Sequence, residues 1–574
     1  MKKNYVGIAC SQHDPAIAIV NAEGKVVYAE STERYLQNKR SWNTFADDLI
    51  HVEKLLSKYT DKDADLVISK TWSGKTQFSL KVIFLLMPLF KRKMIPYVYN
   101  VYYYLIESLQ NVYDFSGKSL RFQRRMTNPN VKVDVENCDH HLTHAATACF
   151  SSPFKEGVCA VIDGFGESTS TSFYRYENGK ITKIKGIKKS LQSLGMFYSM
   201  ICKVCGFDPI KGEEWKVMGL APYGKFDATI YSKLKKILEV DGNRFVSRNF
   251  SILNVYDELF DMQLEPGRSS IEAADIAYNG QLIFCELMTE ILNQLSDRNI
   301  SENLILGGGC ALNSACNGLI LDKTPFKHLH VYSAPGDEGN AIGAALLAYY
   351  KDNPTKVPSG TQMTPYLGER MNPEVISSCQ TFSGLPHKVL TGKPLYEKVA
   401  TLLSEGKIIG WVQGRAEFGP RALGNRSILA DPRSVEMKDA LNSRVKFREE
   451  FRPFAPSILH EYGDQYFENY QVSPYMERTL KFKQEVWDKV PAVVHEDKTG
   501  RAQSVTREWN EKYYDLISAF NEITGVPVLI NTSFNVMGKP IVHTVEDALS
   551  VFFTSGLDVL VIEDMVFEKS DFQS

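Results

Sequence analysis

Residues 5–30 read YVGIACSQHDPAIAIVNAEGKVVYAE, and residues 157–186 read GVCAVIDGFGESTSTSFYRYENGKITKIKG. Each stretch begins with an apolar strand, breaks at a polar or glycine-rich loop, and returns as an alternating strand. Turn residues separate strands in both, namely Glu23 and Gly24 in the first stretch and Asn178 and Gly179 in the second. The two stretches predict one strand arrangement used twice in an α/β chain.

Two later segments predict a ligand site at the ends of strands. Asn303–Leu306 reads as a short strand that runs into Gly307–Gly309, and residues 310–320 read as a helix. A second turn, at residues 335–339, precedes a helix of small residues at 340–350. Glycine at such a turn lets backbone N–H groups approach a phosphate closely. A tight turn would explain either segment alone, but the two together favour a duplicated actin-like or sugar-kinase-like fold that binds phosphates.

Length and composition restrict the class of protein. The 574 residues predict two to four domains, and a Pro-, Thr-, Ser- and Gly-rich stretch at 353–363 predicts a boundary between domains 1–355 and 356–574. A formal charge of -2 gives no reason to expect nucleic acid as a partner. The longest apolar run, Val82–Phe90, is too short to span a bilayer. Scattered cysteines and the absence of a visible signal peptide predict a cytoplasmic protein.

Residues 139–146, DHHLTHAA, place His140 and His144 at positions i and i+4. In a helix both imidazoles would project from one face, which is a metal-ligand spacing, although such pairs also occur as capping or core histidines. Asp163 and Asp337 each lie where a strand meets a glycine-rich turn and are the candidate carboxylates. This donor set suits a divalent metal such as iron, manganese or zinc.

Two further groups of residues are candidates for chemistry. His13 lies just past the first strand, where a neutral imidazole would serve as a general base, or simply as a capping residue. Residues 414–456 are rich in basic side chains threaded among Gly, Pro and Phe, which predicts ordered turns that aim cations at a small anion rather than a solvated face. The basic residues of this segment are Arg415, Arg421, Arg426, Arg433, Arg444, Lys446, Arg448 and Arg452, and Arg501 and Ser533 lie in similar turns.

Taken together, these strings resemble the O-carbamoyltransferase family that includes the tobramycin, cephalosporin and nodulation-factor carbamoyltransferases. The motifs are HDPA, DHHLTHAA, VIDGFGE, GEEWKVMGLAPYG, LGGGCALN, PGDEGNAIGAA, GRAEFGPRALGNRS, KFREEFRPFAP and NTSFNVMGKP, in family order from about residue 5 to residue 566. The resemblance implies an N-terminal domain similar to the tRNA threonylcarbamoyl transferases and a C-terminal domain similar to the YrdC carbamoyl-adenylate synthases.

The resemblance also implies a reaction and its residues. ATP, with Mg²⁺, and carbamoyl phosphate would give carbamoyl-adenylate, and the carbamoyl group would pass to a hydroxyl of a sugar-like or secondary-metabolite acceptor. The metal ligands would be His140, His144, Asp163 and Asp337, with His13 near the acceptor hydroxyl. The adenylate would lie against Glu214, Lys216, Gly308, Gly309 and Asn313. Carbamoyl phosphate would be held by Arg421, Lys446, Arg452, Arg501 and Ser533.

Other classes make different demands on the sequence. A tRNA threonylcarbamoyl-type modification enzyme is the alternative, but it lacks the PRALGNRS and REEFRPFAP strings. A hydrogenase-maturation carbamoyltransferase would carry paired CxxC motifs, and the one CxxC here, Cys202 and Cys205, reads as helix packing. A non-catalytic actin-like assembly protein would not need the histidine pair. The identity of the acceptor and whether the chain forms a homodimer stay open.

The segment from Lys75 to Arg125 has nine basic and two acidic residues and many Phe and Tyr side chains. It matches no motif of the family. An ordinary helical insertion, a platform for the acceptor, and a weak contact with a membrane surface are the three interpretations.

Overall fold

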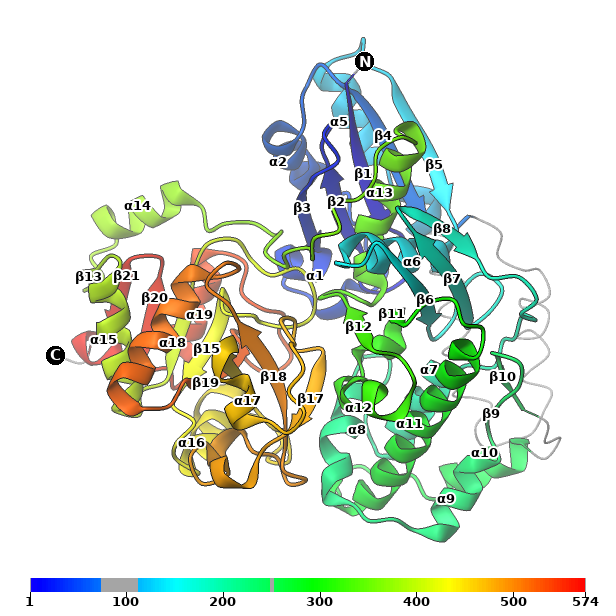
Figure 1. The fold of residues 1–574 in the computed structure, drawn as a ribbon. Coiled ribbons are helices and arrows are strands. Elements are labelled where there is room, and N and C mark those ends of the chain that lie inside the picture. Colours follow the sequence, from blue (N-terminus) through cyan, green and yellow to red (C-terminus); the bar gives the residue numbers. More distant parts are fainter. Residues whose placement is uncertain (1, 74–111, 248–251, 573–574) are drawn as a thin grey trace. The chain divides into compact units, whose positions relative to one another are not determined.

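Two five-stranded sheets with one strand order build the first part of the chain (Figure 1). The first sheet has the order β3 (Val26–Ser31), β2 (Ala16–Val20), β1 (Lys3–Ala9), β4 (Asp65–Thr71) and β5 (Val133–Cys138). The second has the order β12 (His328–Val331), β11 (Asn303–Gly307), β6 (Glu156–Ile162), β7 (Thr171–Glu177) and β8 (Lys180–Lys183). The structure, a computed structural model, describes residues 2–73, 112–247 and 252–572.

The pairing directions of the two sheets are also the same. In each sheet the first three strands along the chain pair antiparallel, and the fourth and fifth add parallel on the other side of the first strand. The predicted hairpins are present, and Asn178 and Gly179 both have positive φ at the turn between β7 and β8. The repeat predicted from residues 5–30 and 157–186 is therefore confirmed, and so is the α/β class.

Helices α6 (His140–Ser151) and α13 (Asn340–Asp352) pack against each other between these two sheets (Figure 1). Helix α13 lies on β1 and β2, and α6 lies on β6 and β11. The small residues of α13 permit this close contact, since a Cβ atom at Gly343 would lie 2.0 Å from the carbonyl oxygen of Thr143. The helix predicted at 340–350 thus holds α6, which carries the predicted His140 and His144, in place.

The remaining helices and strands of this part surround the sheets. They are α2 (Leu49–Tyr59), α5 (Lys118–Thr127), α7 (Leu194–Val204), α8 (Glu214–Leu220), α9 (Ala228–Lys235), β9 (Glu239–Val240), β10 (Phe245–Val246), α10 (Ile252–Phe260), α11 (Ala274–Ser296) and α12 (Ser314–Lys323). None of the helices within the described ranges has the length and apolar character needed to cross a membrane.

A second compact unit follows, built on a nine-stranded mixed sheet. Its order is β13 (Lys388–Val389), β21 (Met565–Glu568), β20 (Val559–Ile562), β14 (Ile409–Val412), β15 (Arg426–Ala430), β19 (Val528–Ser533), β16 (Ala455–Leu459), β18 (Thr499–Val505) and β17 (Arg478–Lys481). Its helices are α14 (Pro373–Phe382), α15 (Lys393–Ser404), α16 (Glu436–Leu441), α17 (Gly463–Tyr466), α18 (Glu511–Thr524) and α19 (Val545–Thr554). The likeness of this unit to YrdC stays a prediction.

The two units are not simply consecutive in sequence. The first comprises residues 1–33 and 40–363, and the second comprises residues 34–39 and 364–574. Helix α1 (Thr32–Leu36) enters the six-residue segment. In the second unit the buried Arg34 donates to the carbonyl oxygen of Gly419 at 2.7 Å, and Gln37 donates to that of Ile541 at 3.0 Å. Nothing in residues 34–39 predicts this crossing.

Candidate functional site

The N-terminal end of α6 carries the predicted histidine pair. Asp139 caps the helix by accepting a hydrogen bond from the backbone N–H of Leu142 at 2.9 Å, so the helix begins at His140. His140 and His144 therefore lie one turn apart on the same face, and each side chain is only 1% exposed. Their Nε2 atoms are 3.3 Å apart.

Two carboxylates converge on the same point. Asp163 directly follows β6, and Asp337 lies in the turn before α13. The Nε2 atom of His140 is 3.3 Å from Oδ2 of Asp163, and that of His144 is 3.3 Å from Oδ1 of Asp337. One donor atom from each of the four residues lies within 4.8 Å of the other three. The predicted set is therefore brought together.

The charges of this cluster fit a divalent cation. Burial alone would raise the pKa of Asp163, but His140 and His144 hold it well below its usual range. Burial likewise acts to lower the pKa of His144, yet hydrogen bonds that His144 donates to the carboxylates of Asp163 and Asp337 raise it to about 10. The carboxylates thus stabilise positive charge at this point, and two imidazoles with two carboxylates are a donor set for iron, manganese or zinc.

Residues that the sequence did not single out support the ligands. Trp72 stacks on the imidazole of His140, with ring centroids 4.3 Å apart. The carboxylate of Glu167 accepts hydrogen bonds from the backbone N–H of His140 at 3.3 Å and from the backbone N–H of Ser73. The side-chain amide of Asn340 lies 3.1 Å from Nε2 of His144. Such neighbours fix the orientation of metal ligands, but their separation in sequence hides them.

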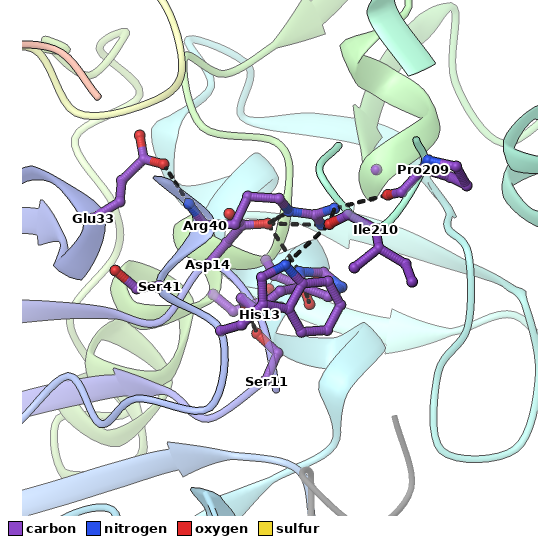
Figure 2. Close-up of polar contacts among 12 residues, drawn as sticks. Ser11, His13, Asp14, Glu33, Arg40, Ser41, Pro209 and Ile210 are labelled. Atoms are coloured by element: carbon purple, nitrogen blue, oxygen red, sulfur yellow. Dashed lines mark hydrogen bonds and ion pairs between the residues drawn. The ribbon is translucent and has the colours of Figure 1, made fainter. Parts of the chain in front are cut away.

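His13 lies beside this cluster. Its Nδ1 atom is 3.9 Å from Oδ2 of Asp337. The same atom is 2.8 Å from Oδ2 of Asp14 (Figure 2). Burial acts to raise the pKa of Asp14, but Arg40 and His13 hold it well below its usual range, so Asp14 is an acceptor. With Nδ1–H donated to Asp14, Nε2 of His13 is left to accept a proton. Asp14 was not predicted as the partner of His13, although it is the next residue in the motif HDPA.

The turn at Gly307–Gly309 joins the four candidate metal ligands to the predicted adenylate residues. Gly308 has φ 88°, and a Cβ atom there would lie 2.4 Å from the carbonyl oxygen of Ile162. The backbone N–H of Gly309 donates to Oδ1 of Asp163 at 2.8 Å. Asn313 caps α12 and exchanges two hydrogen bonds with Gln281, at 3.0 and 3.1 Å. Its amide is thus engaged within the protein.

Glu214 and Lys216 lie on the short helix α8. Glu214 accepts a hydrogen bond from the hydroxyl of Ser199 at 2.9 Å, and Lys216 forms an ion pair with Glu213 at 2.8 Å. The hydroxyl of Ser314 lies 3.5 Å from the sulfur of Met218, which brings α8 next to the first residue of α12. The predicted adenylate residues therefore come from neighbouring elements of the first unit.

The second unit holds a cluster of cations around the buried Lys446. Burial lowers the pKa of Lys446 well below its usual range, and the charges of Arg448, Arg452 and Lys39 lower it further. Burial also lowers the pKa of Arg501 well below its usual range, and the strongest charged neighbours of Arg501 are Arg421, Arg448 and Arg452. Ser533 lies beside the ammonium group of Lys446, which contacts its backbone and hydroxyl oxygens. These interactions link the five predicted residues and add Arg448 and Lys39.

Other arginines of residues 414–456 have structural partners. This corrects the expectation that all the basic side chains of the segment bind an anion. The guanidinium of Arg426, fully buried, donates to four backbone carbonyl oxygens at 2.8 to 3.2 Å. Arg415 donates to the carbonyl oxygens of residues 367 and 368. Arg433 pairs with Asp431, and Arg444 pairs with Asp558. The sequence spacing alone could not separate these from the cluster.

The basic, aromatic segment from Lys75 to Arg125 lies for the most part outside the described residues, since the structure describes it only from residue 112. There Arg124 is 1% exposed and donates to the backbone oxygens of Asp61 and Ala64. Arg124 is therefore a structural residue of α5 and not a surface for the acceptor.

Comparisons with known proteins agree with the motifs. Residues 4–346 match the model of the carbamoyltransferase N-terminus, and residues 400–569 match that of the carbamoyltransferase C-terminus. An uncharacterized protein of Methanocaldococcus jannaschii is 31% identical over 98% of this chain and 99% of its own. The nodulation protein NolO of Bradyrhizobium diazoefficiens is 33% identical over 75% of this chain and 79% of its own.

A crystal structure of full-length HypF in its phosphate- and nucleotide-bound form aligns with 60% of this chain and 55% of its own, at 11% identity and a TM-score of 0.36. That likeness is too low to bear on function. The two family models instead match in order and together cover most of the residues, so the chain belongs to the carbamoyltransferase family of enzymes.

Proposed function

We propose that this enzyme is an ATP-dependent O-carbamoyltransferase that works in two steps. In the first, water cleaves carbamoyl phosphate to carbamate and phosphate, and a carbamate oxygen attacks the α-phosphorus of ATP. Pyrophosphate leaves and carbamoyl-adenylate forms. In the second, an acceptor hydroxyl attacks the carbamoyl carbon, AMP leaves, and the acceptor carries the carbamate ester. The acceptor is a sugar-like or secondary-metabolite molecule.

The observation that carries the proposal is the cationic cluster of the second unit, in which Lys446 is buried and the arginines are partly buried. Arg501 has three guanidinium groups as its strongest charged neighbours, and its buried Nε has no hydrogen-bond partner among the described residues. Cations held together in this way are stabilised by a bound anion, and a phosphate offers the oxygens that guanidinium groups recognise. We assign carbamoyl phosphate to Arg421, Lys446, Arg452, Arg501 and Ser533, and we add Arg448. Rigid donors there would stabilise the charge that develops on the departing phosphate.

The transfer step is assigned to the first unit. A divalent metal, iron as the first candidate, held by His140, His144, Asp163 and Asp337 would supply Lewis acidity toward the carbamoyl or phosphate oxygens. His13, oriented by Asp14, takes the proton of the acceptor hydroxyl at Nε2. Gly308 and Gly309, with Glu214, Lys216 and Asn313, are the residues against which we place the adenylate.

Two variants test the division of labour. We expect Arg452→Ala to lower phosphate release from carbamoyl phosphate by on the order of 10²–10³-fold, because a hydrogen-bond donor to the phosphate is lost. We expect His13→Ala to retain ATP- and carbamoyl phosphate-dependent pyrophosphate release and to lose carbamoylation of the acceptor. Arg444→Ala, which removes a cation paired with Asp558, is the matched control and should change neither. Equal loss of pyrophosphate release in Arg452→Ala and His13→Ala would refute the proposal.

A further inference from the structure

Arg40 has an unusual backbone and a fully engaged side chain. Its φ is 60° and that of Asp14 is 53°, both in the left-handed region that non-glycine residues rarely adopt. Such a conformation is strained, and it persists only where its surroundings hold it. Two backbone hydrogen bonds do so, from the N–H of Asp14 to the carbonyl oxygen of Arg40 at 2.8 Å and from the N–H of Asn43 to that of Gln12 at 3.0 Å. The chain around Asp14 is thereby fastened to the chain around Arg40.

The guanidinium group of Arg40 fixes the partner of His13. Its Nε and Nη2 atoms donate to Oδ2 of Asp14 at 3.1 and 3.0 Å, and the same oxygen accepts from Nδ1 of His13 at 2.8 Å. Trp42 adds a lateral contact, since its ring lies 5.2 Å from the His13 ring and 5.3 Å from the guanidinium carbon. His13 is therefore oriented through Asp14 by Arg40.

The other side of the same guanidinium group holds a second segment. Its Nη1 atom donates to the carbonyl oxygens of Pro209 and Ile210, each at 3.2 Å, and Figure 2 shows Arg40 between these carbonyls and Asp14. The indole N–H of Trp42 also donates to Ile210 at 3.0 Å. Residues 208–213 form a loop that is held by its own hydrogen bonds. The backbone N–H of Asp208 donates to the carboxylate of Glu213 at 2.9 Å, and the backbone N–H of Gly212 donates to the carbonyl oxygen of Pro209 at 3.0 Å. The loop leads directly into α8 with Glu214 and Lys216.

We infer that Arg40 is a positioning residue that couples adenylate binding at residues 208–216 to the alignment of His13. This inference rests on the proposed function, because it takes Glu214 and Lys216 to contact the nucleotide. A displacement of the loop moves two of the hydrogen-bond acceptors of one rigid guanidinium group, and the third acceptor is the carboxylate that holds His13. The transfer step would thus be set up only when the nucleotide segment is in place.

Hydrogen exchange of the full chain, with and without ATP and Mg²⁺, tests the coupling. In the wild-type protein we expect ATP to slow amide exchange at residues 208–216 and also at residues 12–14. In Arg40→Ala, ATP should still protect residues 208–216, but the protection gained at residues 12–14 should fall by about tenfold because charge-assisted hydrogen bonds are lost. Guanidinium ion at a non-denaturing concentration should restore part of it.

Arg40→Lys provides a second variant that keeps the positive charge if Arg40→Ala fails to fold. One ammonium group cannot reproduce the planar fork, so coupling should again be reduced. Arg175→Ala, which removes an exposed arginine from β7, is the control and should behave like the wild type. Equal protection of residues 12–14 in the wild type and the Arg40 variants would overturn the inference, as would loss of protection at residues 208–216. A wild-type protein that ATP protects in neither segment would instead overturn the proposed nucleotide site, and the inference with it.

Discussion

Arg501 is a partly buried guanidinium group on β18 whose strongest charged neighbours are all cations. Such a group destabilises the protein unless an anion is bound, so removing its charge should help the free enzyme. We expect Arg501→Met to raise the free energy of unfolding by about 1–3 kcal/mol in phosphate-free buffer. The same variant should lose the stabilisation that inorganic phosphate gives the wild type. Thermal unfolding across a phosphate titration measures both effects, and a less stable variant that keeps the phosphate shift would contradict the assignment.

His144 makes a sharper test of the metal site, because a close neighbour offers a control. We expect His144→Ala to lose bound metal and carbamoyl transfer together, since one of four donors is removed from a buried site. His141 lies on the same helix turn, but its Nδ1 atom contacts the hydroxyl of Ser172 at 2.9 Å instead. His141→Gln should therefore keep its metal. Elemental analysis of both purified variants decides the matter, and an unchanged metal content in His144→Ala would remove this ligand from the set.

Asp47 gives the free energy of unfolding a predictable dependence on pH. Its buried carboxyl accepts hydrogen bonds from the backbone N–H groups of Gly117 at 2.9 Å and Ser119 at 3.1 Å. Burial raises its pKa to about 6 against the opposing effect of those bonds. The folded state therefore holds the proton more tightly, and the resulting stabilisation is present below pH 4 and is lost as the pH rises through 6.

Asp47→Asn removes this titration. The free energy of unfolding of the variant relative to the wild type should rise by about 2 kcal/mol between pH 4 and pH 7. Urea unfolding at several pH values provides the measurement. A flat difference for Asp47→Asn over this range would contradict the prediction.

At the scale of elements, the contact between α6 and α13 determines the geometry of the metal site. A Cβ atom at Gly343 would meet the backbone oxygen of Thr143, one residue before His144. We expect Gly343→Ala to push the helices apart, to cost about 1–3 kcal/mol of stability and to lower metal content as well. Lys351→Ala, at the exposed end of α13, is the control. Full metal occupancy in Gly343→Ala would show that α6 is held by other contacts.

The helices and strands near the site were largely predictable, because each motif combines a regular spacing of side chains with residues that begin or end a helix or strand. The pair at i and i+4 predicted a helix, and α6 begins at His140 because Asp139 caps it. The glycines after β11 predicted the turn at Gly308, where a side chain would meet Ile162. Long-range partners were not predictable, because Trp72 and Glu167 reach His140 only through the sheet that brings their segments together. Likewise, nothing local distinguishes Arg448, in the cluster, from Arg444, which pairs with Asp558.

At the scale of the whole molecule, the second unit needs residues from the N-terminal part of the chain. Lys39 acts on Lys446, and Arg34 and Gln37 bind to the backbone at Gly419 and Ile541. We expect a fragment of residues 364–574 to bind inorganic phosphate several-fold more weakly than the full chain, because a cation and the hydrogen bonds of Arg34 and Gln37 are missing. Calorimetric titration of both would measure this, with Lys39→Ala in the full chain as a partial mimic. Equal affinities would show that residues 34–39 are dispensable for the cluster.

The placement of residues 34–39 also determines an order of events on the ribosome. Arg34 and Gln37 emerge early, whereas Gly419 and Ile541 are made several hundred residues later. At roughly 5–20 residues per second that interval is on the order of 20 to 100 s. During synthesis the strands on either side of this segment, β3 and β4, can pair with β2 and β1 long before the partners of residues 34–39 exist. The second unit can therefore be completed only late in synthesis, when residues 364–574 fold around residues 34–39, which were made long before.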